Sequence, residues 1–260
     1  KPFKEEQLIE KAGRLVNLQE KSQPQVIKTI NDPVSILMVD DKPAIVQQVK
    51  EALAATSWKI EGKATIAEAM EAVNHEIPDA ILVNLALNDD AAATLFRQLR
   101  SVPKTRSIPV LGMCIKTDQE SQSRAEQTGF NGVITKPIDV EALHGKLCRT
   151  MALDTSPLYF STSEGILFVT LPPKVTTHVT TDLGRYLDPR IHDLVNGGMN
   201  KLILDLSKIM EIDVSMIKTI IATLENCQKL SIKIRIVGSA VVSRELKGFQ
   251  ETSSLTVYST

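Results

Sequence analysis

The chain has 260 residues, with 31 acidic and 30 basic side chains and a formal net charge of −1. This balance gives no general attraction to nucleic acid or to an anionic membrane surface, and no apolar run approaches the roughly 20 residues that a membrane span needs. Three cysteines lie far apart without metal-ligand spacing. We therefore expect a cytoplasmic protein with reduced thiols that neither inserts into a membrane nor binds nucleic acid.

The first segment, residues 1–32, carries apolar residues at helical spacing between Lys4 and Lys21. This pattern predicts an amphipathic helix, and Ser22-Gln23-Pro24-Gln25 ends it. A lone amphipathic helix needs a surface on which to pack, so this segment is predicted to be either the tail of a preceding domain or a leader or dimerisation helix.

Residues 33–155 alternate between strand and helix patterns. The predicted strands are Ser35–Asp40, Trp58–Lys63, Ala80–Leu87, Pro109–Ile115 and Gly132–Thr135. The predicted helices are Lys42–Thr56, Ile66–Glu76 with Thr65 as its cap, Asp90–Ser101, Gln119–Thr128, and a last one from the cap Asp139 to about Met151. Five such units imply a parallel sheet with helices on both faces, and their spacing fits the flavodoxin-like strand order 2-1-3-4-5.

Polar residues stand where these strands end. Asp40 and Asp41 end the first strand, Asn84 lies near the end of the third, and Lys136 ends the fifth. Because ligands bind at the carboxyl ends of parallel strands, we expect these side chains to share one crevice. Two carboxylates and a lysine would suit a hard cation and a phosphoryl group.

Four stretches carry a family resemblance over about 120 residues. Ile36-Leu37-Met38-Val39-Asp40-Asp41, Pro78 to Asn84, Ile108-Pro109-Val110 and Thr135-Lys136-Pro137 resemble the receiver domain of two-component response regulators. In that family the acid pair helps to hold Mg²⁺, and an aspartate at the end of the third strand accepts the phosphoryl group. A Thr or Ser on the fourth strand and an aromatic residue on the fifth report its presence, and the lysine contacts the phosphoryl oxygens. The opening Lys1-Pro2-Phe3 resembles the last strand-to-helix junction of such a domain, so a receiver could precede residue 1.

This sequence departs from the family pattern at three positions. Asn84 stands at the acceptor position, Cys114 at the Thr/Ser position and Val133 at the aromatic position. An amide nitrogen is not a nucleophile, and Asn84 removes an anionic ligand from the Mg²⁺ site. A thiol is a weak hydrogen-bond donor. The three losses together predict a pseudo-receiver that needs no cofactor, with Mg²⁺ binding through Asp40 and Asp41 weakened.

Two other interpretations of these positions stay open. Asn84 could replace a native acceptor Asp in a working receiver, or Asp40 and Asp41 could persist only as strand-end and helix-cap residues. Cys114, as a buried strand cysteine, is expected to be chemically inert.

Residues 156–260 predict a second α/β domain. We predict strands at Leu158–Phe160, Ile166–Leu171, Lys201–Ser207, Ile232–Val237 and Leu255–Tyr258. We predict helices at Thr180–Asn196, Val214–Lys229 and Val241–Phe249. The four histidines, His75, His144, His178 and His192, are scattered and are expected at the surface.

The second domain resembles a STAS domain at Leu202-Ile203-Leu204-Asp205-Leu206-Ser207, at Ile212-Asp213-Val214-Ser215 and at Ile234 to Gly238. STAS domains occur in anti-sigma-factor antagonists, where a partner kinase phosphorylates a Ser or Thr that directly follows the aspartate. Here Val214 follows Asp213, so the switch is absent or has moved to Ser215. We expect Asp213 to be the N-cap of the following helix and the Ser215 hydroxyl to bond local backbone.

The two resemblances together imply a signalling protein of two-component or phosphorelay type that binds proteins and is not an enzyme. A pseudo-receiver would be joined through Asp154–Pro157 to a STAS output domain. The expected partner is an anti-sigma factor, a serine-kinase-like protein or a component of a histidine-kinase pathway, and a homodimer stays open. The alternative is a phosphorylation-gated response regulator whose native residue 84 is Asp.

Overall fold

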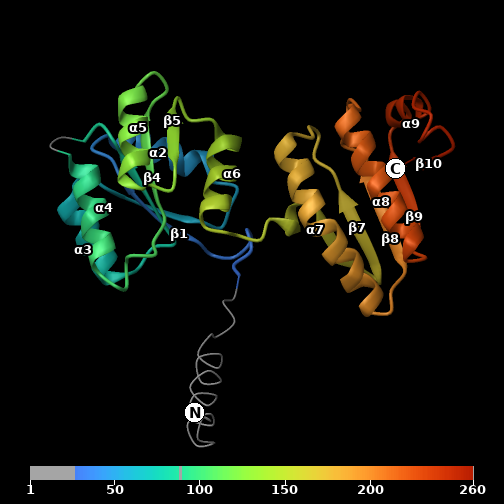
Figure 1. Ribbon diagram of the computed structural model, residues 1–260, viewed down its shortest axis with the longest axis horizontal. Coiled ribbons are helices and arrows are strands. Elements are labelled where there is room, and N and C mark those ends of the chain that lie inside the picture. Colours follow the sequence, from blue (N-terminus) through green and yellow to red (C-terminus); the bar gives the residue numbers. More distant parts are fainter. Residues whose placement is uncertain (1–26, 88–89, 260) are drawn as a thin grey trace, which may run out of the picture.

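The computed structural model describes residues 27–87 and 90–259, which form two α/β units one after the other (Figure 1). The helix predicted between Lys4 and Lys21 lies outside the described residues. Within these two ranges, no helix is both long enough and apolar enough to cross a lipid bilayer.

The first unit is built on a parallel sheet with the strand order β2-β1-β3-β4-β5. Its strands are β1 (Ser35–Val39), β2 (Lys59–Lys63), β3 (Ala80–Asn84), β4 (Val110–Ile115) and β5 (Val133–Lys136). This is the flavodoxin-like order that the sequence predicts. All five residues of β3 are buried, as expected of a central strand that is apolar on both faces.

Helices cover both faces of this sheet (Figure 1). They are α2 (Pro43–Ala52), α3 (Ile66–His75), α4 (Ala91–Ser101), α5 (Gln119–Thr128) and α6 (Val140–Thr150). One hydrophobic cluster joins the sheet to α2 and α6, and a second joins it to α3, α4 and α5. The predicted caps are confirmed, because Thr65 accepts a hydrogen bond from the Glu68 N–H and Asp139 accepts one from the Ala142 N–H.

The second unit has a mixed sheet with the order β10-β9-β8-β7-β6. Its strands are β6 (Phe160–Ser163), β7 (Ile166–Thr170), β8 (Lys201–Leu206), β9 (Lys233–Gly238) and β10 (Val257–Tyr258), and its helices are α7 (Thr177–Asn196), α8 (Val214–Lys229) and α9 (Ala240–Leu246). Only the β6–β7 hairpin is antiparallel among the described strand pairs of this unit.

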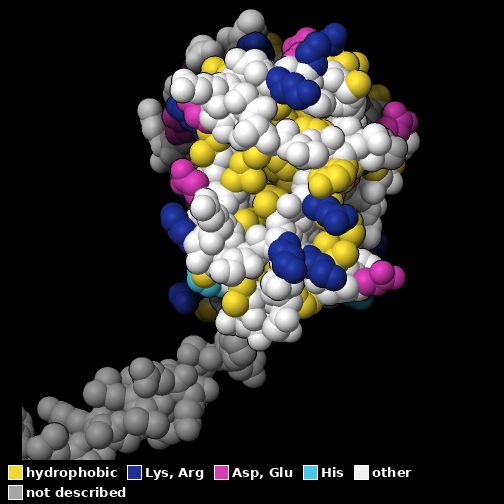
Figure 2. All heavy atoms as spheres, turned by 90° about the vertical axis from the view of Figure 1, so that its right-hand side faces the viewer, with side chains coloured by type: hydrophobic (Ala, Val, Ile, Leu, Met, Phe, Trp, Pro, Cys, Tyr) yellow, Lys and Arg dark blue, Asp and Glu magenta, His cyan; other side chains and the backbone are white. Residues whose placement is uncertain are grey.

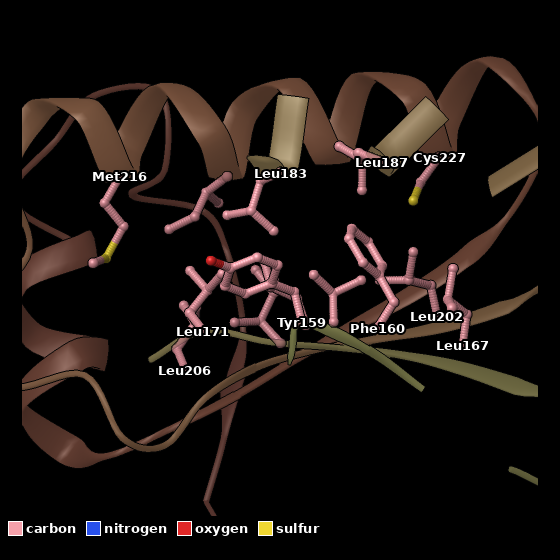
Figure 3. Close-up of a cluster of buried hydrophobic side chains, with 14 of the residues drawn as sticks. Tyr159, Phe160, Leu167, Leu171, Leu183, Leu187, Leu202, Leu206, Met216 and Cys227 are labelled. Atoms are coloured by element: carbon pink, nitrogen blue, oxygen red, sulfur yellow. The ribbon is translucent and has the colours of Figure 1, made fainter. Parts of the chain in front are cut away.

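All three helices of the second unit lie on one face of its sheet. The strands from β7 onward are neighbours in chain order, and right-handed crossovers place each connecting helix on the same side. Figure 3 shows Leu183 and Leu187 of α7 and Met216 of α8 pointing toward strand side chains such as Leu202. The domain therefore has one core, and no described helix covers the opposite sheet face.

Several predicted strand boundaries differ from the structure; β10, for example, begins at Val257 and not at Leu255. Two of the differences have a clear local cause. The strand predicted at Leu158–Phe160 begins at Phe160, because Ser156–Leu158 forms a short 3₁₀ turn in which Pro157 has no N–H to donate to a ladder. The strand predicted to reach Leu87 ends at Asn84, whose own side chain accepts a hydrogen bond from the Ala86 N–H at 3.2 Å and turns the chain.

The connection between the units is held on both sides. The backbone of Asp154 pairs with the segment before β1, donating to the Lys28 carbonyl and accepting from the Ile30 N–H. The Thr155 hydroxyl donates to the Asp182 carboxylate of α7 at 2.9 Å. The residues between α6 and β6 are thus tied to both units by hydrogen bonds.

Two of the four histidines correct the expectation that all lie at the surface. His144 of α6 is half-buried and stacks on Trp58 with ring centroids 5.0 Å apart. Burial, together with the charge of His178, lowers the pKa of His144. His178 of α7 is also half-buried, and its ring lies against Gly145 of α6, where an added Cβ would be 3.5 Å away. These residues form a direct contact between α6 and α7.

Candidate functional site

Four of the predicted site residues lie together at the carboxyl edge of the first sheet. Asp40 follows β1, Asn84 is the last residue of β3, and Lys136 is the last residue of β5. Because β3 lies beside β1, the Asn84 amide nitrogen (Nδ2) comes within 3.4 Å of one carboxylate oxygen of Asp40 and one of Asp41. The polar residues that the sequence predicts in one crevice are therefore in contact there.

Lys136 completes the cluster. Its Nζ lies 3.0 Å from the second Asp40 carboxylate oxygen and 3.4 Å from the Asn84 side-chain oxygen. The Asp40 side chain is fully buried, and that of Lys136 is 16% exposed. The buried Asp40 carboxylate thus has the Lys136 side chain as a direct partner, and contact between the two offsets part of the cost of removing each from water.

The Asn84 side chain uses both ends of its amide. Its nitrogen faces the two carboxylates, and its oxygen accepts hydrogen bonds from Lys136 and from the Ala86 N–H. An aspartate in the same place would face Asp40 and Asp41 with like charge at this distance. The amide instead supplies donors to both carboxylates, and no buried side-chain polar atom in the described ranges lacks a partner. The cluster is thus satisfied by the protein itself.

A divalent cation is the group that the receiver resemblance implies at this edge. Asp40 and Asp41 are hard oxygen donors of the kind that Mg²⁺ prefers, but the third position presents an amide whose NH₂ group faces them. Among residues 27–87 and 90–259, no group of three or more His, Cys, Asp or Glu side chains could hold a metal ion. The residues present fit Mg²⁺ poorly, because one of the three expected carboxylates is absent.

Cys114 and Val133 are the residues predicted to stand where the receiver family has its reporting residues. Cys114 on β4 is 2% exposed, and burial, with a further contribution from Asp118, raises the pKa of its thiol. Val133 on β5 is half-buried and packs against the cluster formed with α3, α4 and α5. Neither residue supplies the hydroxyl or the ring that the family uses.

The predicted switch region of the second unit lies at the start of α8. Asp213 is its N-cap, as predicted, and accepts a hydrogen bond from the Met216 N–H at 2.7 Å. Val214 is 62% exposed. The expectation that the Ser215 hydroxyl bonds local backbone is wrong: Ser215 is exposed, and its hydroxyl makes no hydrogen bond to any described residue.

Two residues near this region were not predicted from the sequence to belong to it. Met210, in the turn between β8 and α8, is 76% exposed. Glu245 of α9 accepts a hydrogen bond from the Ile212 N–H at 2.9 Å and ties that turn to α9. The available signal was an apolar Ile209-Met210 pair in a short turn, but a turn residue can face either way, so exposure could not be predicted.

Comparison with known proteins agrees with this architecture. A family model for the response regulator receiver domain matches residues 36–147, and one for the STAS domain matches residues 156–255. Response regulator Rre1 of Synechocystis is 24% identical over 122 residues, 46% of this chain and 53% of Rre1. Response regulator MprA of a Mycobacterium species is 27% identical over 150 residues, 57% of this chain and 64% of MprA.

One solved structure also matches part of this chain. The crystal structure of a two-component response regulator from Clostridium difficile covers 46% of this chain and 96% of its own, with 23% identity and a TM-score of 0.41. The matches with Rre1 and MprA each cover less than two thirds of the relative's own length. This chain contains a response regulator receiver domain followed by a STAS domain.

Proposed function

We propose that this chain is a signalling adaptor that binds proteins, in which a pseudo-receiver controls a STAS output domain without accepting a phosphoryl group. The observation that carries the proposal is the Asn84 amide, which stands at the acceptor position and donates to both Asp40 and Asp41. An amide cannot form an acyl phosphate. Its contacts hold the acid cluster in one arrangement that needs neither phosphate nor metal.

The buried thiol at Cys114 supports the same conclusion. In a working receiver a hydroxyl at this position follows the phosphoryl group, whereas a thiol with a raised pKa is a weak donor. Val133 is a partly buried residue that packs against the core cluster of α3, α4 and α5. The input to this domain is then a binding event, for which the helices on either side of the sheet offer a surface.

The exposed start of α8 is the proposed partner surface of the STAS domain. Val214 and Met210 are both large apolar residues in solvent, and buried apolar anchors dominate the energetics of protein interfaces. Val214 stands where anti-sigma-factor antagonists carry a hydroxyl that phosphorylation switches. A residue that cannot be phosphorylated supports constitutive binding to a partner such as an anti-sigma factor or a serine-kinase-like protein.

Contact between the domains gives a route for communication. His144 and Gly145 of α6 meet His178 of α7, and Asp182, one turn further along α7, bonds Thr155 of the connection. A partner that shifts α6 would move α7, which packs in the STAS core. We infer that the receiver acts on the STAS domain through this helix pair.

A binding titration tests the STAS half of the proposal. A partner captured by the isolated residues 156–260 is titrated against the full chain and against Val214→Asp. The variant should mimic an added charge at the interface and lose about 2 kcal/mol of binding free energy or more, if the site is a central hot spot.

Ser215→Ala is the matched control, one residue along the same exposed turn. It should bind the partner like the wild type with or without kinase treatment. If kinase treatment releases the wild type from the partner but does not release Ser215→Ala, binding is not constitutive and Ser215 is the switch.

The second candidate function is a phosphorylation-gated regulator with Asp at position 84. The observation in its favour is that Asp40 and Lys136 retain a 3.0 Å ion pair beside that position. A large change in shape or dimerisation of Asn84→Asp on treatment with acetyl phosphate and Mg²⁺ would favour this candidate.

A further inference from the structure

The face of the STAS sheet that the helices leave open carries apolar residues in its middle. Phe168 of β7 and Ile203 of β8 are paired in register, and Val237 of β9 lies one row further along. All three are half-buried, and none belongs to the core cluster on the other face. Residues on either side of them in the strands, such as Leu202 and Leu204, point into that core.

Three cations lie beside these apolar residues on the same face. Lys201 of β8 stands directly opposite Lys233 of β9, and Arg235 stands opposite Ile203. Like charges directly opposite each other across strands are destabilising. Among the ion pairs of the described residues, none involves Lys201, Lys233 or Arg235.

Two neighbours of Arg235 do not neutralise this charge. The Arg235 guanidinium lies over the Tyr258 ring of β10 at 5.5 Å, a contact that holds it on the face without an anion. Asp205, the acidic residue on this face of β8, lies one row beyond, and its carboxylate accepts from the Ser207 N–H. Figure 2 views the molecule from the side of α9 and β10, the edge of this sheet, and shows hydrophobic, lysine and arginine side chains together on that side of the molecule.

We propose that this open sheet face, defined by Phe168, Ile203, Val237, Lys201, Lys233 and Arg235, is a second docking surface, separate from the start of α8. Its occupant is an amphipathic segment of a partner protein that carries apolar residues flanked by Asp or Glu. The apolar residues would cover Phe168 and Ile203, and the acids would neutralise the three cations.

The charges argue against the other occupants. A second copy of this chain packed face to face would place three cations against three cations, which costs free energy instead of gaining it. Nucleic acid could neutralise the three cations with its phosphates, but Ile203 and Val237 offer no ring on which a base could stack, so this aliphatic part of the face would stay exposed. A partner of opposite charge gains both the apolar burial and the ion pairs.

A pair of synthetic helical peptides tests the charge preference. One is built from leucine, alanine and glutamate, and the other has lysine in place of each glutamate. The full chain should bind the acidic peptide, with NMR shifts at Phe168, Ile203 and Val237, and should bind the basic peptide more weakly by about tenfold or more, since each exposed ion pair contributes up to about 1 kcal/mol.

Charge reversal at the three cations gives the decisive variant. Lys201→Glu/Lys233→Glu/Arg235→Glu should invert the preference so that the basic peptide binds more tightly. Arg235→Glu alone, at an exposed position, keeps the test available if the triple variant fails to fold and should reduce the preference.

A second triple variant makes the same charge change on exposed residues of the receiver domain, Lys104→Glu/Arg106→Glu/Lys116→Glu, and should leave the preference unchanged. An equal effect of this control, or unchanged preference in the STAS variants, would overturn the proposal.

Cross-linking identifies the natural occupant. A photoreactive residue at position 203 of the full chain, expressed in the source cells, should capture an acidic amphipathic segment of another protein, and Arg235→Glu should reduce the capture. Cross-links to a second copy, to lipid or to nucleic acid would overturn the proposal. Val214→Asp should leave this capture unchanged, so failure here is distinguishable from failure of the α8 surface.

Discussion

Replacing Asn84 by Asp should destabilise the receiver domain in the absence of Mg²⁺. The Asn84 amide nitrogen now lies 3.4 Å from Asp40 and 3.4 Å from Asp41. A carboxylate in its place exchanges two favourable contacts for two repulsions in a position that is 3% exposed. The 3.4 Å contact with Lys136 offsets part of this cost.

The size of the effect follows from these distances. Two unit charges 4 Å apart interact by about 4 kcal/mol at an effective dielectric constant of about 20. The new carboxylate is repelled by Asp40 and Asp41 and attracted by Lys136, so the net cost is about one such interaction. Small movements of the exposed Asp41 reduce this cost further. We therefore expect the free energy of unfolding to fall by about 2–3 kcal/mol, in the range known for single buried charge changes.

Urea unfolding with EDTA and with Mg²⁺ measures this effect. Because Asn84→Asp restores a third carboxylate, Mg²⁺ should bind the folded variant and return about 2.7 kcal/mol at a concentration 100 times its Kd. The wild type should change little between the two conditions.

The double variant Asp41→Asn/Asn84→Asp is the matched control, because it keeps a carboxylate at position 84 with the charge count of the wild type. It should recover most of the lost stability in EDTA and respond weakly to Mg²⁺. The reasoning is refuted if Asn84→Asp is as stable as the wild type in EDTA, or if both gain equally from Mg²⁺.

The remaining predictions concern buried groups. Burial lowers the pKa of His144. The neutral imidazole therefore contributes its full stability above the unfolded pKa near 6.5, and this stability is lost as the pH falls toward the folded pKa. The urea midpoint should consequently fall more between pH 7 and pH 5 in the wild type than in His144→Phe. The Cys114 thiol, buried with a raised pKa, should resist iodoacetamide in the folded protein and react in urea, and rapid labelling of the native state would contradict this. Thr155→Val removes the hydroxyl that donates to buried Asp182 and should cost about 1–3 kcal/mol of unfolding free energy, whereas Thr162→Val on exposed β6 should cost almost nothing in the same titration.

Much of the architecture could be predicted because its signals are local. Buried parallel strands such as β3 are apolar on both faces, and the N-cap residues Thr65, Asp139 and Asp213 mark where their helices begin. The contact between Asp40, Asn84 and Lys136 was also predictable, since parallel strands end at one edge.

Other features depend on contacts that local patterns do not encode. The end of β3 is set by the Asn84 side chain turning back to the Ala86 N–H, and the burial of His144 follows from its stack on Trp58. The orientation of the Asn84 amide, with nitrogen toward the acids, depends on residues at the ends of two other strands, β1 and β5. The open face of the STAS sheet becomes visible only when all three helices are placed on the other side.

The pseudo-receiver proposal is tested most directly by incubating the native-sequence chain with acetyl phosphate and Mg²⁺ and examining it by intact-mass spectrometry. A working receiver domain is labelled in parallel under the same conditions. We predict that the receiver control acquires a phosphoryl group and that this chain, which has an amide at position 84, does not. An acid-stable, base-labile phosphoryl group on this chain would contradict the proposal.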